Sequence, residues 1–268
     1  MNPRQACLHC VRREPAAPFE AALWVAAEHD PDVQPAQLMS DLHSLQVDVS
    51  ASLPLLPVRE LAQPLLRRLS TLGFARDEYH PLRADAALLH KVLSRKRGQP
   101  LALGLLALEL ARRLDIPLVG VNFPGHFLLQ VPGADHLLDP CGGRRLYPQD
   151  CRELLTRQYG DAPELRAEYL SAATSVQMLQ RLSRNLRQLH SSHDQHLPAL
   201  KDAERVLELG PGTVADYLAR ATLYQQLGCP QAERFDLEHA LLLSDDPVQR
   251  LRLAERLQLL PGAAHRLH

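Results

Sequence analysis

Residues 95–130 read RKRGQPLALGLLALELARRLDIPLVGVNFPGHFLLQ, and Leu137-Leu138-Asp139-Pro140 follow shortly after. This stretch has the layout of a cysteine-nucleophile active site: a turn with glycine leads into a helix, one strand starts at His126, and another ends at Asp139. The nucleophile is missing, because residues 95–130 contain no Cys, Ser or Thr. A catalytic triad needs a thiol or hydroxyl, a base and a residue that orients the base, and only the last two are present. The pattern therefore suggests an enzyme scaffold that is reused for binding.

The hydrophobic pattern around this stretch predicts an α+β fold. Apolar residues at helical spacing predict helices over residues 19–27, 35–47, 57–72, 84–96 and 100–114, and again from Pro148. The helix over 100–114 is apolar nearly all round, so we expect it to be central and buried. Short β-type runs separated by turns predict strands over residues 118–123, 126–131, 136–139 and 144–146. The expected fold class is a small, helix-backed antiparallel sheet between two helical segments.

The C-terminal hundred residues contain a repeat. Residues 202–209 (DAERVLEL) match residues 236–243 (DLEHALLL) with an offset of 34, and Leu189-His190 maps onto Leu223-Tyr224 with the same offset. A period of 34 residues is the spacing of tetratricopeptide repeats, which are pairs of helices. Such repeats offer a groove for a protein partner. Two copies also suit packing on the neighbouring domain, and the sequence favours that second role.

Composition excludes several classes of function. The net charge of −1 predicts neither nucleic-acid nor membrane binding. No apolar run approaches the ~18 residues of a membrane span, and the N-terminus lacks the apolar core of a signal peptide, so we expect a cytoplasmic protein. Cys7-x-x-Cys10 is half of a zinc site without a second half, so we predict no structural metal, and we expect no cofactor. The oligomeric state is left open.

The chain resembles the bacterial SirB-type proteins, in which a transglutaminase-like domain precedes tetratricopeptide-like repeats. The resembling segments, which with the tail span roughly residues 35–245, are RKRGQP (95–100), LELARRLDIPL (108–118), VGVNFPGHF (119–127) and LDPCGG (138–143). The resemblance implies a papain- or transglutaminase-like core. We expect a flexible tail over residues 1–17, a domain of lead-in helices and core over 18–165 (core about 76–160), and helical repeats over 166–268.

The resemblance also locates the lost nucleophile. Active members of the wider superfamily start the central helix with Gly-x-Cys and supply His and Asp from adjacent strands. Alignment from Ile116-Pro117 places that Cys at Pro100, or at Ala102 with a slip of two residues. Neither side chain is a nucleophile, so only His126 and Asp139 carry over, as a vestigial pair. Pro100 also removes one of the N–H groups that would lower a thiol's pKa at a helix N-terminus.

The register of the expected hairpin relates the remaining candidates. If the turn is centred between Gly133 and Ala134, residues pair when their numbers sum to 267, so His126 faces Cys141. Asp139 then lies on the same side of the sheet as Cys141, and we expect a hydrogen bond between His126 and Asp139. Cys141 is the alternative nucleophile, opposite a base but without a helix dipole behind it.

These observations lead to two hypotheses. The first is a non-catalytic, cytoplasmic interaction or regulatory protein that holds a protein partner with its old cleft and its repeat surface. The alternative is a cysteine-dependent hydrolase or acyltransferase that works through Cys141, His126 and Asp139. The sequence identifies neither the partner nor the pathway.

Overall fold

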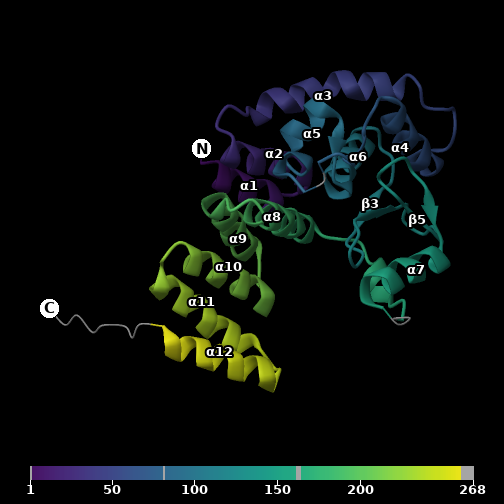
Figure 1. The fold of residues 1–268 in the computed structure, drawn as a ribbon. Coiled ribbons are helices and arrows are strands. Elements are labelled where there is room, and N and C mark those ends of the chain that lie inside the picture. Colours follow the sequence, from purple (N-terminus) through teal and green to yellow (C-terminus); the bar gives the residue numbers. More distant parts are fainter. Residues whose placement is uncertain (1, 81, 161–163, 261–268) are drawn as a thin grey trace. The chain divides into compact units, whose positions relative to one another are not determined.

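The computed structural model describes residues 2–80, 82–160 and 164–260, and the chain forms two compact units, 1–182 and 183–268 (Figure 1). The helices of the first unit are α1 (Pro3–Arg12), α2 (Pro18–His29), α3 (Pro35–Ser50), α4 (Ala62–Thr71), α5 (Leu89–Arg95), α6 (Pro100–Arg113) and α7 (Pro148–Tyr159). Its strands are β1 (Ala75–Arg76), β2 (Arg97–Gly98), β3 (Val119–Val121), β4 (Leu128–Gln130), β5 (Leu137–Leu138) and β6 (Arg145–Leu146). Helix α8 (Ser175–Ser191) is followed by α9 (His196–Leu209), α10 (Val214–Gln226), α11 (Pro230–Leu243) and α12 (Pro247–Leu259).

The first unit is built on an antiparallel sheet with the order β3-β4-β5-β6. One face packs on α7 through a cluster that includes Val121, Leu128 and Leu155. Helix α6 also contacts β3 and β4, so the sheet is backed by helices. Leu129 pairs with Leu138, and 129 and 138 sum to 267. The expected α+β class and the expected hairpin register are therefore confirmed.

Helix α6 is central to this unit, as its composition predicts. It begins with Pro100 at its first position and ends at Arg113, which the cap residue Leu114 follows. Its buried residues run almost without interruption from Leu101 to Ala111. The buried carboxylate of Glu109 stays charged because Arg112 and Arg113 donate hydrogen bonds to it at 2.7–2.9 Å. A helix buried on all sides fixes the position of its own N-terminus, where the expected active site would lie.

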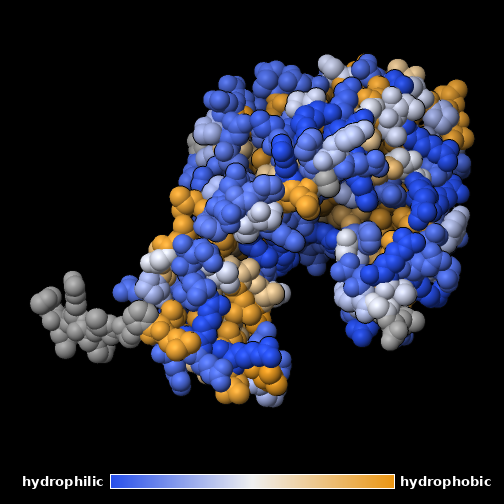
Figure 2. Space-filling model, in the orientation of Figure 1, coloured by the Kyte–Doolittle hydropathy of each residue, from blue (hydrophilic) through white to orange (hydrophobic). Residues whose placement is uncertain are grey.

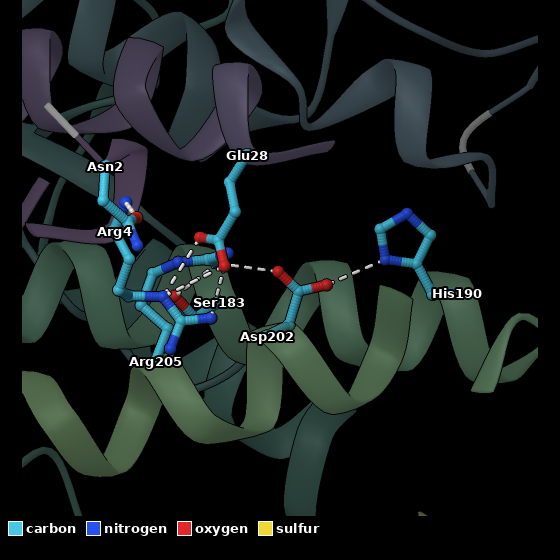
Figure 3. Close-up of polar contacts among 7 residues, drawn as sticks. All are labelled: Asn2, Arg4, Glu28, Ser183, His190, Asp202 and Arg205. Atoms are coloured by element: carbon cyan, nitrogen blue, oxygen red, sulfur yellow. Dashed lines mark hydrogen bonds and ion pairs between the residues drawn. The ribbon is translucent and has the colours of Figure 1, made fainter. Parts of the chain in front are cut away.

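The N-terminal segment differs from the expected flexible tail. Residues 3–12 form α1, which packs on α2 and buries Cys7 and Cys10. The Nε of Arg4 in α1 donates hydrogen bonds to both carboxylate oxygens of Glu28 in α2, each at 3.1 Å (Figure 3). The reason lies in the spacing of Ala6, Cys7 and Cys10, which places small apolar groups on one helix face. The two thiols belong to the hydrophobic core.

The segment before α6 also differs from the sequence expectation. Residues 84–96 divide into a 3-10 turn (Ala84–Ala86) and the shorter α5, because the backbone N–H of Gln99 donates to the carbonyl of Ala86 at 2.6 Å. The expected helix over 57–72 likewise begins only at Ala62, after a 3-10 turn. Strands β1 and β2 pair in parallel, with Arg76 opposite Gly98. This short pairing brings Arg76 to the chain segment that enters α6.

The first unit extends beyond the expected boundary after residue 165. Val121 forms a bridge with Ala172, and the backbone N–H of Ala173 donates to the carbonyl of Gly120 at 2.8 Å. Residues 172–173 thus lie along the free edge of β3, which is why the division between the units falls after Leu182. Of the helices in the described ranges, none combines the length and apolar character that crossing a bilayer requires.

The second unit contains the expected helical repeat. Asp202 in α9 and Asp236 in α11, which are 34 residues apart, are both fully buried. Asp202 lies between His190 and Arg205, with its oxygens 2.8 Å from His190 Nδ1 and 2.6 Å from Arg205 Nη1 (Figure 3). Asp236 accepts two hydrogen bonds from Arg220 of α10 at 2.6 and 2.8 Å. Each of these two buried aspartates therefore contacts the preceding helix, Asp202 through His190 of α8 and Asp236 through Arg220 of α10.

Another buried carboxylate of this unit, Asp216, lies in the first turn of α10. It forms a capping box with Thr213 and accepts two hydrogen bonds from Arg184 of α8, both at 2.8 Å. Burial alone would raise its pKa, but the hydrogen bonds from Arg184 and Thr213 outweigh burial and lower the pKa to about 2. Hydrophobic residues also lie on the surface of this unit (Figure 2), and the exposed large apolar side chains of α11 and α12 include Leu242 and Leu251.

Candidate functional site

The candidate site lies at the N-terminus of α6, where the sequence places the lost nucleophile. Pro100 occupies the first helical position, after the extended cap residue Gln99. Proline has no backbone N–H and fixes the φ angle that the first turn needs. This position therefore offers neither a nucleophilic side chain nor its own backbone donor.

The ring of Phe127 fixes the turn that carries His126 against α6. A Cβ atom added to Gly104 in α6 would lie 2.4 Å from Cε1 of this ring, and one added to Gly120 in β3 would lie 2.7 Å from Cζ. The buried ring thus fills the space that two glycines leave. This contact was not predicted from the sequence, although a glycine within a helix of Leu and Ala is a signal for close packing. The contact places residue 126 beside the first half of α6.

His126 itself precedes the strand, which begins at Leu128 rather than at the histidine as expected. Its backbone N–H donates to the carbonyl of Phe123 at 3.0 Å, closing a turn around Gly125. Burial lowers the pKa of His126, and the positive charges of Arg76 and Arg181 lower it further. Since the ordinary value is already 6.5, the imidazole is neutral at pH 7.

Three arginines act on His126, and none of them was predicted from the sequence. Arg76 comes from β1, Arg157 from α7 and Arg181 from α8. Arg181 Nη1 also donates to the carbonyl of Phe123 at 3.0 Å, so it holds the same turn in place. These residues are far apart in the chain, and no local motif links them. The surroundings of His126 are therefore more positive than the motif alone suggests.

Asp139 follows β5 and turns toward its own loop. Its Oδ1 accepts a hydrogen bond from the backbone N–H of Cys141 at 2.8 Å, and its carbonyl accepts one from Gly143 at 2.9 Å. Among the described residues, no hydrogen bond joins Asp139 to His126, which differs from our expectation. The reason is that Oδ1 of Asp139 accepts its hydrogen bond from the loop that follows β5. The effect of Asp139 on His126 is one of charge, which opposes the lowering of the histidine's pKa.

Cys141 lies in the same cluster but is not activated. Burial raises the pKa of this thiol, the negative charge of Asp139 raises it further, and Arg76 opposes both, with a result of about 12. A nucleophilic cysteine needs a lowered pKa so that the thiolate is populated near neutral pH. At pH 7 Cys141 is a protonated thiol. Arg76, His126, Asp139 and Cys141 thus form one electrostatic cluster, and its thiol is not ready to attack.

Comparison with known proteins agrees with this geometry. Residues 36–184 match the model of the transglutaminase-like superfamily, and residues 186–258 match the tetratricopeptide repeat. UPF0162 protein PA3419 of Pseudomonas aeruginosa is 60% identical over 270 residues, with 100% of both chains covered. The chain belongs to the SirB-type family of the transglutaminase-like superfamily. A UPF0162 protein of Xylella fastidiosa (strain Temecula1) is 35% identical to this SirB-type chain, covering 84% of it and 83% of the relative.

More distant members of the SirB-type family match part of the chain. Protein SirB1 of Salmonella typhimurium is 28% identical over 176 residues, which is 64% of this chain and 65% of SirB1. The repeat match over 186–258 confirms the tetratricopeptide period that the 34-residue offset predicted. The SirB-type architecture of this chain is therefore a transglutaminase-like domain followed by helical repeats.

Proposed function

We propose that this SirB-type protein is a non-catalytic, cytoplasmic regulatory protein that holds a protein partner. The observation that carries the proposal is the chemistry at the start of α6. Pro100 stands where the superfamily's thiol is expected, and Cys141, the thiol nearest to His126 in the predicted register, has a pKa of about 12. Pro100 has no thiol, and Cys141 is protonated near neutral pH, so acyl transfer lacks its nucleophile.

The polar cluster then serves structure and recognition. The side chains of Arg76 and Arg157 are exposed beside a neutral histidine, and Asp139 holds the loop of Cys141. Such a surface offers charged donors to another protein without a proton-transfer path to a nucleophile. Tetratricopeptide repeats commonly bind proteins, and the second unit supplies this kind of surface. We infer no bound cofactor or metal for this role.

A search for a covalent intermediate tests the proposal. The full chain is incubated with a glutamine-containing protein and a fluorescent primary amine, and separately with an activated ester, and its intact mass is then measured. We expect no acyl adduct, and we expect His126→Ala and Cys141→Ser to match the unmodified chain. An adduct on Cys141 whose formation requires His126 would establish the hydrolase or acyltransferase alternative instead.

A second measurement tests the partner. The full chain, immobilised under native conditions, is exposed to an extract of the bacterium that encodes it, and bound proteins are cross-linked and quantified. We expect one partner retained in a fixed ratio to the chain by the wild type and by Cys141→Ser alike, since the thiol has no role in binding. Absence of any such partner would contradict the proposal.

A further inference from the structure

The charges that act on His126 are not balanced. Three of them are positive and belong to Arg76, Arg157 and Arg181, which we call the arginine cluster, and one is negative and belongs to Asp139. Because the imidazole is neutral at pH 7, these four side chains leave a net charge of about +2 around it. A concentration of positive charge raises the local concentration of anions. The excess therefore directs attention to an anion as the ligand.

Contacts hold the arginine cluster against the turn that carries His126. Arg181 Nη1 of α8 donates to the carbonyl of Phe123 at 3.0 Å, and the backbone N–H of His126 donates to the same carbonyl. Gly125 of this turn lies against the end of α7, because a Cβ atom added to it would lie 2.5 Å from Oε1 of Gln158. The turn thus packs against both helices that carry arginines of the cluster.

The third arginine comes from a strand. Arg76 lies in β1, opposite Gly98 of β2 in their parallel pairing. Its side chain is close enough to Cys141 for its charge to oppose the raised pKa of that thiol. Elements that are distant in the chain therefore direct their guanidinium groups to one place.

Two members of the arginine cluster lack a carboxylate partner. In the described ranges, neither Arg76 nor Arg157 forms an ion pair, and both residues are exposed. By contrast, Arg184 and Arg220 of the second unit each pair with a buried aspartate, at 2.8 and 2.6 Å. Asp139 is turned to its own loop, where Oδ1 accepts a hydrogen bond from a backbone N–H. The cluster can thus take up a negative group without breaking an ion pair of Arg76 or Arg157.

We propose that the arginine cluster binds a phosphate monoester group beside His126. This inference rests on the proposed function, because it treats the site as a binding site, and it specifies the group that the site holds. A phosphate monoester carries a charge of about −1.5 to −2 at pH 7, which matches the excess charge better than the single charge of a carboxylate does. Its three terminal oxygens suit guanidinium groups that arrive from separate elements. A phosphorylated side chain of a protein and a free phosphate ester present this same group.

The proposal links anion binding to the protonation of His126. In the free protein, burial lowers the pKa of this histidine, Arg76, Arg181 and Arg157 lower it further, and Asp139 opposes them. A bound dianion adds negative charge at the same place, so the pKa of His126 is expected to rise. Linkage is reciprocal, so protonation of His126 must strengthen anion binding by the same factor.

Proton nuclear magnetic resonance of the full chain tests the site. Inorganic phosphate, sulfate and acetate are titrated separately while the ring signal of His126, identified by its loss in His126→Gln, is followed between pH 5.5 and 8. Sulfate remains a dianion throughout, so any pH dependence of its binding belongs to the protein. We expect the two dianions to bind at least about tenfold more tightly than acetate. We also expect sulfate to bind at least about threefold more tightly at pH 5.5 than at pH 8, and the midpoint of His126 to rise.

Matched variants assign this binding to the cluster. Arg157→Gln is expected to weaken sulfate binding by about fivefold or more, whereas Arg152→Gln, at an exposed position about 140° away around α7, leaves it unchanged. Arg76→Gln is expected to weaken binding similarly. Asp139→Asn keeps an oxygen for the backbone N–H of Cys141 and is expected to strengthen binding by roughly two- to threefold. Circular dichroism establishes that each variant is folded, and if one arginine variant does not fold, the other and Asp139→Asn decide the matter.

Peptides separate the two sources of the phosphate group. A pool of fluorescein-labelled hexapeptides with a central phosphoserine is compared with its unphosphorylated twin by fluorescence anisotropy, and inorganic phosphate serves as the competitor. Binding of the phosphorylated pool at least about tenfold more tightly than inorganic phosphate supports the site with a protein as its source. Equal binding of the phosphorylated pool and inorganic phosphate supports the site with a free phosphate ester as its source.

The contrary outcomes are distinct from failure of the proposed function. If the dianions do not bind, or bind Arg76→Gln and Arg157→Gln as they bind the wild type, the phosphate site is wrong even where no acyl adduct forms. A midpoint of His126 that stays fixed at saturating sulfate would also overturn it. An acyl adduct on Cys141 would instead overturn the proposed function, even where phosphate binds.

Discussion

The reactivity of Cys141 gives the sharpest test of the reasoning about the site. Its pKa of about 12, against an ordinary 9.0, is a difference of about 3, so below pH 9 its thiolate is about a thousandfold rarer than that of an unperturbed thiol. A more basic thiolate is a stronger nucleophile, and this recovers roughly 15- to 30-fold. The net expectation is labelling by iodoacetamide roughly 30- to 60-fold slower than for an ordinary exposed thiol.

The chain supplies its own reference for this measurement. Cys229 is exposed, whereas Cys7, Cys10 and Cys151 are buried in the core. Timed labelling between pH 7 and 10, followed by mass spectrometry of the cysteine peptides, compares Cys141 with Cys229 in one sample. Labelling of Cys141 as fast as that of Cys229 at pH 7 would refute the claim that the thiol is inactive.

The direction of two substitutions distinguishes the inactive site from a catalytic one. Asp139→Asn removes a charge that raises the thiol's pKa but keeps an oxygen for the backbone N–H of Cys141, so we expect faster labelling. Each pKa unit removed speeds labelling roughly three- to fourfold. Arg76→Gln removes a charge that lowers the pKa, so we expect slower labelling. A catalytic triad predicts the reverse for Asp139, because loss of the orienting acid slows a working nucleophile.

Three further predictions concern stability. Gly104→Ala places a methyl group 2.4 Å from the ring of Phe127, and we expect a loss of about 1 kcal/mol or more in urea denaturation followed by the single tryptophan. Asp216→Asn is expected to destabilise α10 by about 2 kcal/mol at pH 7, from a pKa of about 2 against 3.8. Since the pKa of Asp216 is lower in the folded state, its contribution to stability is complete above pH 4 and is lost as the pH falls toward 2. Hydrogen exchange of α10 in the wild type and in Asp216→Asn measures this contribution. A difference between the two proteins that does not change with pH would contradict the assignment. Arg220→Ala leaves the buried Asp236 unpaired, and we expect about 3–5 kcal/mol less stability by thermal circular dichroism, with an unchanged melting curve as the contrary result.

Local pattern was sufficient for much of the fold. The apolar run after Pro100 specifies a buried helix because every face of it lacks charge until Glu109. The hairpin register followed from the turn at Gly133, since a pairing that begins at a tight turn fixes each later pair. The 34-residue offset predicted the repeat because equivalent positions, such as Asp202 and Asp236, are buried alike in successive helix pairs.

Where local pattern failed, long-range contacts decided the structure. Small apolar residues near the N-terminus formed a helix because α2 offered a surface to pack on, and propensity alone does not report such a surface. The helix expected over 84–96 was interrupted because Gln99 donates to Ala86. Likewise, residues 172–173 joined the first unit through the edge of β3. Each difference depends on a partner that is distant in the chain.

The sequence by itself determined which side chains are present: it placed proline at the head of the central helix and left His126 and Asp139 on neighbouring segments of a hairpin. Those facts are local, since residue identity and strand register are written along one stretch of chain. Only the tertiary structure decided how these groups behave. Arginines from β1, α7 and α8 act on His126, and burial beside Asp139 raises the pKa of Cys141. Protonation depends on charges and solvent within a few ångströms in space, and the order of residues does not specify which those are.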